Sequence, residues 1–597
     1  MDPKPLSSRV CFLLILLFGI AAYSNTFHVP FQYDDVSDVA GNHILKPPLD
    51  LGKIWESYPP RFVTSLSFAL QFAITGSTPW GFHVVNLLIH LLASITIFGI
   101  TRLLLKTPVL RDTIPSSQCD LFALGPALLF LAHPVQTESV TYIVQRLASL
   151  ATLFYLLTLW MYLKARLENT RHYRLAFLFM TIALLTKEIC LTLPLAIGLV
   201  DFCFFPISET ETVFKKIRRW LPFAILWGAM LIYFYASSAG KIISNHGAVG
   251  MSISPWDYFL TQFRVLRTYL RLLMFPVNQC IDYDYRLSTG WGDPDTWAAF
   301  SLLFSMFILA LVFFKKQRLL SFGILWFFLT LSIESSFIPL KDVLVEHRLY
   351  LPMLGFSLFA ASFLWKCLRS PARFIAVILA IAIIFSGMTY ARNEVWKSPF
   401  SLWQDTIRKS SHKCRPYTWL GDSYAYELKD YKTALFYYKK AISTGSISPP
   451  LLAAIANAYS ALGDTPKSTY FGEWALSFSK AKEYAGHEDF FNKNQATLLI
   501  ANNNVSEATR TLLEASRRDP RNPSWYIQLG GLYRASGQAD AAIASFRKAI
   551  EVAPPASQDG YNALALLYGE KGEEQKAVVI LVKYLKAKKK YKPLFGN

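Results

Sequence analysis

Residues 372–390 read ARFIAVILAIAIIFSGMTY, a run of nineteen residues in which Arg373 is the only charged side chain. A helix needs about 20 apolar residues to cross a bilayer, so this run predicts a transmembrane helix. Comparable apolar runs occupy the chain before it, whereas Ala-, Tyr- and Lys-rich helical segments follow it. We therefore predict a membrane domain over residues 1–393 and a second domain over residues 394–597.

The composition of the whole chain supports a membrane protein. Of its 597 residues, 53% are hydrophobic and 17% are charged, and the mean hydropathy is +0.29. These values argue against a soluble enzyme and against a disordered chain. Seven cysteines exclude a disulfide framework, and no CxxC or Cys/His cluster suggests structural zinc. The net charge of +19 could indicate nucleic-acid binding, but we assign it to basic loops that face the cytoplasm.

Eleven apolar runs are long enough to be read as membrane spans. They lie near residues 10–27, 80–104, 121–139, 148–165, 173–187, 189–206, 220–238, 296–314, 319–337, 347–367 and 372–390. The first lacks a cleavage motif of small residues, so we expect a retained anchor. Every second loop is rich in Lys and Arg, which places the N-terminus in the cytoplasm. Because the number of spans is odd, the second domain is expected outside the cytoplasm.

Two further segments are expected to lie in the membrane interface. Residues 256–276 carry Arg264, Arg267 and Arg271 on one helical stripe. Three arginines inside hydrocarbon would be costly, so the segment predicts an interfacial or re-entrant amphipathic helix on the outer side. Residues 62–75 mix apolar and polar side chains in a similar way.

The second domain carries a repeated pattern of small and aromatic residues. Residues 523–533 read PSWYIQLGGLY, and Gly537, Ala542 and Phe546 follow at the offsets of a tetratricopeptide repeat. The register recurs in five copies, the first of which has one extra residue. Such hairpins bury a continuous core only by stacking, and they form a concave groove. We expect the groove to bind a partner or acceptor protein, with a rigid spacer as the alternative.

Polar and ionisable residues of the membrane domain gather at the outward ends of the predicted spans. Such side chains are rare in a bilayer unless they are paired or functional. The candidate site residues are Asp34, Asp35, Arg61, His133, Glu138, Arg146, Lys187, Glu188, Glu346, His347, Arg348 and Tyr350. Cations and carboxylates from separate helices at one face indicate a shared cavity, in which arginine would bind a lipid-linked phosphate. Alternatively, Glu138 with Arg146 and Glu346 with Arg348 form ordinary structural ion pairs.

The adjacent carboxylates Asp34 and Asp35 lie in the first outer loop. Acidic residues in a solvated loop are often only soluble surface. A carboxylate in this place could instead take a proton from an acceptor hydroxyl as a general base. Two carboxylates could also hold a divalent metal ion.

Read together, several motifs make the chain similar to the TMTC family, the transmembrane and tetratricopeptide-repeat O-mannosyltransferases with the GT-C membrane fold. The motifs are Tyr33-Asp34-Asp35, Arg61 to Leu66 with Trp80 to Asn86, His133 to Val140, Thr186-Lys187-Glu188, Glu346 to Pro352 and the junction from Arg392 to Trp403. They keep the family's order over nearly the whole chain.

The resemblance implies an outward-facing active site. The donor would be a sugar on a polyprenyl or dolichyl phosphate, and the acceptor a Ser or Thr hydroxyl of an extracytoplasmic protein. A nucleotide sugar is not expected, in keeping with a sequence that has no Gly-rich phosphate loop. The family's loop carboxylate corresponds to Asp34, and its Lys-Glu step to Lys187 and Glu188. Its Glu-Arg segment corresponds to Glu346–Pro352, where His347 stands between the two charges and its role is open.

On this basis we predict a single displacement with inversion at the anomeric carbon. Asp34 would act as general base with Asp35 beside it. Arg348, Lys187 and Arg146 would bind the donor phosphate and stabilise the leaving group. The residues expected to orient these groups or to contact the sugar are His133, Glu138, Glu188, Glu346, His347, Tyr350 and Arg61. A divalent metal ion is left open and not favoured, and no other cofactor is expected.

The chain is shorter than animal members of the family, and it shows a small repeat array and no retention signal. These features favour a bacterial inner membrane with periplasmic repeats over an endoplasmic-reticulum membrane with lumenal repeats. Three other functions stay open: a transferase acting on a lipid or glycan acceptor, a transporter, and a non-catalytic assembly scaffold. The one-sided polar cluster argues against the transporter, and a scaffold would leave that cluster unexplained.

Overall fold

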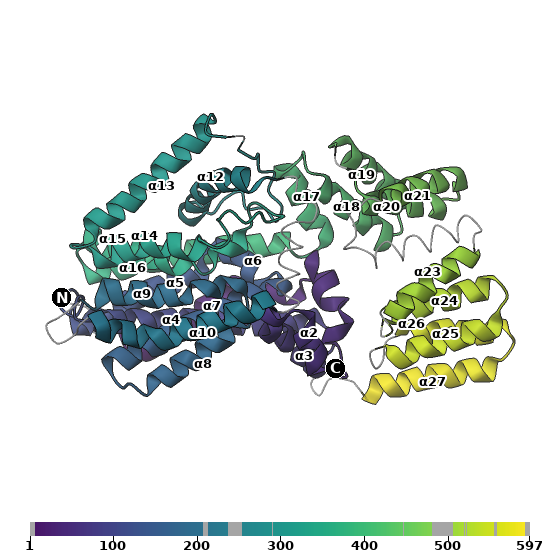
Figure 1. Cartoon of the computed structure of the whole chain (residues 1–597), viewed down its shortest axis with the longest axis horizontal. Helices are drawn as coiled ribbons and strands as arrows, with labels where there is room; N and C mark the ends of the chain where they lie inside the picture. The colour runs from purple at the N-terminus through teal and green to yellow at the C-terminus, as the bar shows by residue number, and fades with distance from the viewer. Residues whose placement is uncertain are drawn as a thin grey trace. The chain divides into compact units, whose positions relative to one another are not determined.

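The computed structural model describes residues 6–206, 213–236, 253–288, 290–445, 447–479, 505–518, 520, 522–553 and 558–590. Within these residues every regular element is a helix, so the predicted all-α fold is confirmed. Contacts divide the chain into two units (Figure 1). The first is Met1–Ala40, Gly52–Phe68 and Thr78–Lys409, and the second is Gly41–Leu51, Ala69–Ser77 and Ser410–Asn597. The helix α17 (Pro399–Lys409), which follows the predicted domain boundary at residue 393, belongs to the first unit.

Each of the eleven predicted spans contains a helix. These helices are α1 (Ser8–Tyr23), α4 (Pro79–Leu104), α5 (Cys119–Ala132), α7 (Arg146–Leu167), α8 (His172–Leu184), α9 (Leu193–Phe204), α10 (Val213–Ala236), α13 (Pro294–Phe313), α14 (Arg318–Leu331), α15 (Met353–Leu368) and α16 (Pro371–Val395). Among the described residues, five helices are long and apolar enough to cross a membrane, or six if a bent pair counts as one span. A membrane protein is therefore supported, whereas the count of eleven spans is not confirmed. The last two residues of the predicted span 220–238 lie outside the described residues.

Short helical elements fill the connections near the predicted site. They are α2 (Leu51–Ser57), α3 (Phe62–Thr75), α6 (Thr137–Val140) and α12 (Pro255–Met274), together with a π-helical turn η2 (Asp35–Ala40) and the 3-10 turns η6 (Pro134–Gln136), η7 (Ile143–Gln145), η8 (Glu188–Thr192) and η9 (Glu346–Leu349). The predicted helices over 62–75 and 256–276 are thus present as α3 and α12.

Three predicted spans are broken by these connections. After α5 the chain bends by 51° before η6 and α6. The predicted span 121–139 is therefore a bent pair of helices and not one straight helix, because Pro134 has no N–H to donate and its ring clashes with the preceding turn. In the same way α8 ends before Lys187, and α15 begins only after η9.

Helix α5 is at the centre of the first unit. Every residue from Leu121 to Ala132 is buried, and α5 packs against α1, α4, α15 and α16. Beside it, α14 and α15 cross with their backbones in contact. A Cβ on Gly323 would lie 2.5 Å from the carbonyl oxygen of Gly355, so only glycine fits there. Small residues of this kind allow membrane helices to approach closely.

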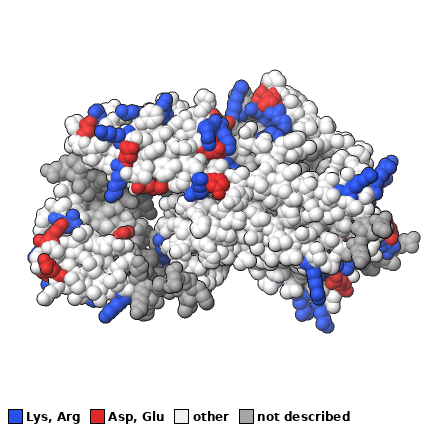
Figure 2. Space-filling view, turned by 180° about the vertical axis from the view of Figure 1, so that it is seen from behind, with Lys and Arg blue, Asp and Glu red and all other residues white. Residues whose placement is uncertain are grey.

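The outer surface of the first unit is apolar along its helices. The side chains of Phe304, Leu311 and Val312 on α13 are exposed, as are Ile383 and Ile384 on α16. Figure 2 shows a broad area without charged side chains, with Lys, Arg, Asp and Glu gathered in small groups around it. Such a surface is suited to a lipid environment.

Two of the three arginines of α12 form ion pairs. Arg264 lies 3.3 Å from Asp293, and Arg267 lies 2.7 Å from Asp295. Both aspartates are at the start of α13, where Asp293 also caps the helix by accepting the N–H of Asp295 at 3.2 Å. The ion pairs offset the cost of burying these two arginines, and the third donates to a backbone carbonyl oxygen at 2.7 Å. The interfacial position of α12 stays a prediction.

The second unit contains stacked helical hairpins. Its helices are α18 (Cys414–Tyr426), α19 (Tyr431–Ser443), α20 (Pro449–Ala461), α21 (Thr465–Ser479), α23 (Val505–Arg518), α24 (Pro523–Ala535), α25 (Ala539–Val552), α26 (Gln558–Glu570) and α27 (Glu574–Lys590). Neighbours in sequence pack as the hairpins α18–α19, α20–α21, α24–α25 and α26–α27 (Figure 1). This is the arrangement that the repeated pattern predicts.

In each of two hairpins a glycine in the first helix makes room for an aromatic ring in the second. The pairs are Gly530 with Phe546 and Gly421 with Tyr438. The glycine and the aromatic residue of the second pair are one residue further apart in sequence, and the extra residue lies in the turn between α18 and α19. Four residues separate α18 from α19, whereas three separate α24 from α25. In the longer turn Lys429 adopts a left-handed φ of 54°, where Gly537 has 74° in the shorter one.

Gly530→Ala is expected to destabilise the hairpin α24–α25, because its methyl group would overlap the ring of Phe546. Overpacking of this kind costs about 1–3 kcal/mol, which corresponds to roughly 5- to 150-fold faster amide exchange. Hydrogen exchange of the purified full chain, read by mass spectrometry, measures the effect. Gly531→Ala is the matched control, because no atom lies within 4 Å of its Cβ position. Equal losses of protection in both variants would contradict the packing argument.

The stability of the hairpin α18–α19 is expected to fall with rising pH. Burial raises the pKa of Asp422 from its ordinary 3.8 to about 6, against the effect of its hydrogen bond with Tyr438. The folded hairpin therefore binds this proton more tightly than the unfolded chain does. The resulting stabilisation is complete below the ordinary pKa of 3.8 and is lost as the pH rises through about 6.

Protection factors for the amides of α18 and α19 measure this change, with α24 and α25 as the internal reference. They should fall between about pH 4 and pH 7. Asp422→Asn should remove the difference, because its amide oxygen still accepts from the Tyr438 hydroxyl, which lies 2.7 Å from the native carboxylate. Protection that rises with pH would refute the assignment.

Candidate functional site

The predicted site residues lie where helices of the first unit stop short. All residues from 121 to 146 are buried, although the stretch after α5 includes irregular backbone around η6, α6 and η7. Irregular backbone at membrane depth is tolerated only where it is enclosed by protein or lines a cavity, since its peptide groups need partners. Buried carboxylates supply several of these partners.

Glu138 joins α6 to η9. Its Oε2 accepts the N–H of Glu346 at 2.9 Å, and its Oε1 lies 2.7 Å from Nδ1 of His347. Glu346 in turn accepts the N–H of Cys280 at 2.7 Å and the hydroxyl of Tyr283 at 2.6 Å. Both carboxylates thus connect separate segments of the chain. The alternative from the sequence paired Glu138 with Arg146 and Glu346 with Arg348, and the partners found here are different residues.

Lys187 and Arg348 converge on a carboxylate that sequence reasoning missed, Glu334. Lys187 Nζ lies 3.3 Å and Arg348 Nε lies 3.8 Å from the same Oε1 of Glu334. The three side chains are almost enclosed, with 9%, 5% and 13% of their surface exposed. A signal for Glu334 was present, since it is the only charged residue in the predicted span 319–337.

Arg146 is buried among neutral partners. Its Nε donates to Oδ1 of Asn86 at 2.7 Å, and Nη2 donates to the carbonyl oxygen of Phe82 at 3.2 Å. Its guanidinium also lies over the ring of Phe68, 4.4 Å from the centroid. The side chain is fixed on several sides, which favours a role in holding α4 and α7 together over direct phosphate binding.

Asp34 and Asp35 differ in environment although they are adjacent. Asp35 is 1% exposed, and its oxygens accept the N–H groups of Gln32 at 3.0 Å and Val144 at 2.6 Å. Burial raises the pKa of the Asp35 carboxyl well above its ordinary value, against the effect of these hydrogen bonds. Asp34 is partly exposed, and its own N–H donates to the hydroxyl of Tyr142 at 3.0 Å. The geometry favours Asp35 as a positioning residue and leaves Asp34 as the more accessible carboxylate.

A third group ties the start of α3 to η8. Glu188 accepts from Arg61 Nε at 3.2 Å and from the hydroxyl of Tyr58 at 2.8 Å. The guanidinium of Arg61 also lies 5.0 Å from the centroid of the Tyr58 ring. Because Glu188 follows Lys187 directly, this group fixes the backbone beside the lysine that reaches Glu334.

His133 and Tyr350 are core residues. Nε2 of His133 lies 2.9 Å from the carbonyl oxygen of Leu273, and its Nδ1 accepts the N–H of Val135 at 3.2 Å. The hydroxyl of Tyr350 lies 2.7 Å from Nδ1 of His90. Both ring nitrogens of His133 are therefore engaged, which favours a structural role for both side chains over sugar contact.

The carboxylates and cations described above lie around the segment from α6 to η7. This segment packs against η9, which carries Glu346 and Arg348, and against η2, which begins at Asp35. The structure therefore brings Glu138, His347, Lys187 and Arg348 into one network. Asp34 lies beside the other end of the same segment, through its contact with Tyr142.

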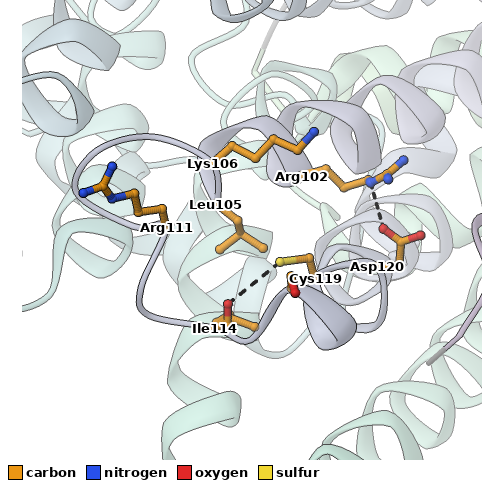
Figure 3. Close-up of a pocket in the computed structure, with 8 residues that line it drawn as sticks. Arg102, Leu105, Lys106, Arg111, Ile114, Cys119 and Asp120 are labelled. Atoms are coloured by element: carbon orange, nitrogen blue, oxygen red, sulfur yellow. Dashed lines mark hydrogen bonds and ion pairs between the residues drawn. The ribbon is translucent and has the colours of Figure 1, made fainter. Parts of the chain in front are cut away.

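A pocket of about 290 Å³ is separate from this network (Figure 3). It lies at the C-terminal end of α4, where Arg102 pairs with Asp120 at 2.7 Å and Lys106 and Arg111 contribute further positive charge. Arg102 is roughly 24 Å along the helix from Asn86, at about 1.5 Å per residue. The pocket belongs to a loop that the sequence predicts to face the cytoplasm.

Asp35→Asn is expected to loosen the junction between η2 and η7. The amide offers one acceptor oxygen where the carboxylate serves two N–H donors, and a buried donor without a partner costs about 1–3 kcal/mol. Hydrogen exchange of the amides around Val144 measures this loss. The control is Asp38→Asn in the same turn, whose side chain is exposed. Unchanged exchange in the Asp35 variant would refute the positioning role.

Comparison with known proteins bears on each unit separately. A family model described as Tetratricopeptide repeat matches residues 415–444 and 525–555. Among solved structures, MamA from Desulfovibrio magneticus RS-1 is 18% identical and covers 30% of this chain and 96% of its own, with a TM-score of 0.23. YrrB, a TPR protein with an unusual peptide-binding site, is 19% identical and covers 31% of this chain and 91% of its own, with a TM-score of 0.22.

The longer matches are to proteins named protein O-mannosyl-transferases. F38B6.6 of Caenorhabditis elegans is 24% identical over 66% of this chain and 57% of its own length. Human TMTC3 is 22% identical over 95% of this chain and 67% of its own length. Mouse TMTC2 is 34% identical over 24% of this chain and 18% of its own length. The chain spans little more than half the length of F38B6.6 and of fruit-fly Tmtc3. Over most of its length the chain is similar to TMTC proteins, as the order of its motifs predicts.

Proposed function

We propose that this chain transfers a sugar from a polyprenyl or dolichyl phosphate to a Ser or Thr hydroxyl of an extracytoplasmic protein. Its similarity to proteins named protein O-mannosyl-transferases supports a sugar transfer to protein. The observation that carries the proposal is the buried pair of Lys187 and Arg348, which share the one carboxylate of Glu334. Cations enclosed in this way suit a ligand that brings its own negative charge, such as a lipid phosphate.

The broken helices support a site at this position. Lys187 lies between α8 and η8, and Arg348 lies in the 3-10 turn η9 before α15, so both cations are in the connections between long helices. Each segment is fixed by a neighbour: Glu188 is held by Arg61, and His347 is held by Glu138. Groups held in advance stabilise charge in a transition state without reorganising, which is worth a few kcal/mol per well-placed donor.

Asp34 is the proposed general base. Its backbone is positioned by Tyr142 and by the buried Asp35, while its own side chain stays partly exposed. In the reaction the acceptor oxygen forms a bond to the anomeric carbon, and the bond from that carbon to the phosphate oxygen breaks. The acceptor proton goes to Asp34, and the leaving lipid phosphate keeps the electron pair beside Arg348 and Lys187. One displacement of this kind inverts the anomeric centre.

The remaining parts of the proposal concern place and partners. The one-sided polar network and the basic loops support a site that faces away from the cytoplasm. The hairpins of the second unit would present the acceptor protein in their groove. A bacterial inner membrane with the second unit in the periplasm is the proposed location, and no metal ion takes part.

Asp34→Asn is expected to lower transfer by about 10²- to 10⁴-fold, the usual contribution of a general base. The assay uses the purified full chain, a panel of polyprenyl-phosphate sugars and a Ser/Thr-rich acceptor protein, and mass spectrometry reads both products. The matched control is Asp38→Asn, an exposed carboxylate of the same turn, which should keep wild-type activity. Hydrogen exchange should be the same in both variants.

Full activity in a folded Asp34→Asn protein would refute the base assignment. If the wild type releases lipid phosphate but modifies only a lipid or glycan, the acceptor class is wrong. If no donor of the panel is consumed while the second unit still captures the acceptor protein, the chain is a scaffold.

A further inference from the structure

We propose that Glu334 sets the net charge of the donor-phosphate site and thereby allows the lipid phosphate product to leave. This inference rests on the proposed function. Glu334 would not touch the sugar; it acts through Lys187 and Arg348 and is a positioning residue that also tunes their charge.

The geometry of the three groups carries the inference. Lys187 and Arg348 reach Glu334 from different segments and meet at the same oxygen, Oε1, at 3.3 and 3.8 Å. Arg348 also donates to the carbonyl oxygens of Val343 at 3.1 Å and Asp342 at 2.8 Å, so its guanidinium is fixed from the other side. The backbone oxygen of Glu334 accepts the hydroxyl of Tyr258 at 2.9 Å. Glu334 is thus held in place between two enclosed cations.

The charge of the trio matches that of a donor better than that of a product. Two cations and one carboxylate leave one net positive charge. A sugar linked through a phosphodiester carries one negative charge, whereas the phosphate monoester that remains after transfer carries about −1.5 to −2 at neutral pH. With Glu334 present, the single net positive charge of the trio neutralises the donor. The product, which carries up to about one more negative charge, is then only partly neutralised. Without Glu334, two net positive charges would favour the product.

Other charged groups also face the trio: Glu138 acts electrostatically on Arg348, Asp342 on His347 and Glu188 on Lys187. His347 hydrogen-bonds Glu138, which in turn accepts the N–H of Glu346. This arrangement is the same before and after transfer. Glu334 is a carboxylate in contact with both cations, so its charge acts directly on the balance between donor and product.

The test measures binding of farnesyl monophosphate, a short product analogue, to the purified full chain, with farnesol as the uncharged probe. Glu334→Gln should bind farnesyl monophosphate about tenfold more tightly, since removal of a nearby negative charge in a buried site is worth at least that factor. Farnesol binding should stay the same. Under steady-state turnover, kcat should fall while KM for the donor does not rise.

The control is Asp201→Asn. Asp201 is also a buried carboxylate with two cationic neighbours, Arg166 and Arg219, but it lies in the helix α9 outside the network. If Asp201→Asn tightens phosphate binding as much as Glu334→Gln does, the effect is a general charge effect and the inference fails.

A second variant keeps the test decisive if Glu334→Gln does not fold. Lys187→Met alone leaves the site with no net charge and should weaken farnesyl monophosphate binding. Lys187→Met combined with Glu334→Gln restores one positive charge and should bring the affinity back to near wild type. A purely structural role for Glu334 predicts instead that the double variant binds more weakly than Lys187→Met.

The two proposals fail in different ways. If the wild type does not prefer farnesyl monophosphate to farnesol, the proposed phosphate site and the proposed function fall together. If the wild type shows this preference and loses it in Arg348→Met, but Glu334→Gln binds no more tightly, only the inference about Glu334 is overturned.

Discussion

Hydrogen bonds from backbone N–H groups to buried carboxylates hold the first unit together where its helices stop. Asp35 accepts from Gln32 and Val144, Glu138 from Glu346, and Glu346 from Cys280. The bond from Gln32 closes a local turn, whereas the other three join segments 66 to 208 residues apart in sequence. In a low-dielectric interior an unpaired peptide group costs several kcal/mol. Glu138 serves a peptide group at the break before α15, and Asp35 serves one before α7. At the break after α5 the ring Nδ1 of His133 accepts the N–H of Val135.

Because these carboxylates accept hydrogen bonds from backbone N–H groups, few carboxylates pair with the buried cations. Arg146 is held by an amide, carbonyl oxygens and aromatic rings, and Arg61 is held by Glu188. Lys187 and Arg348 instead share a single carboxylate. Within the described part of the chain Arg146 also has no carboxylate partner, but its N–H donors are used by Asn86 and Phe82. The trio carries one net positive charge on two cations. An anionic ligand gains most there, because the cost of burying the cations is already met by the fold.

The sequence predicts the helices of both units well, because apolar runs and the repeat register are local signals. Its failures have local causes too. The span 121–139 was too long because a His-Pro step ends α5 at Ala132. Glu334 escaped notice because it stands alone in an apolar run, far in sequence from its two partners. The pairing of Lys187 with Glu334 depends on the packing of η8 against α14 within the fold, which no pattern in the sequence specifies.

Asp34 and Asp35 illustrate why a list of polar residues is not yet a site. The two side chains are chemically identical and adjacent, and motif resemblance selects both. The turn that begins η2 directs Asp35 inward to the peptide groups of Gln32 and Val144 and leaves Asp34 partly exposed. Tyr33 adopts a left-handed φ of 48° at this turn, a conformation that is strained for a residue with a bulky side chain. The bonds made by Asp35 offset that strain, so the buried aspartate keeps its neighbour in a position from which a hydroxyl can be deprotonated.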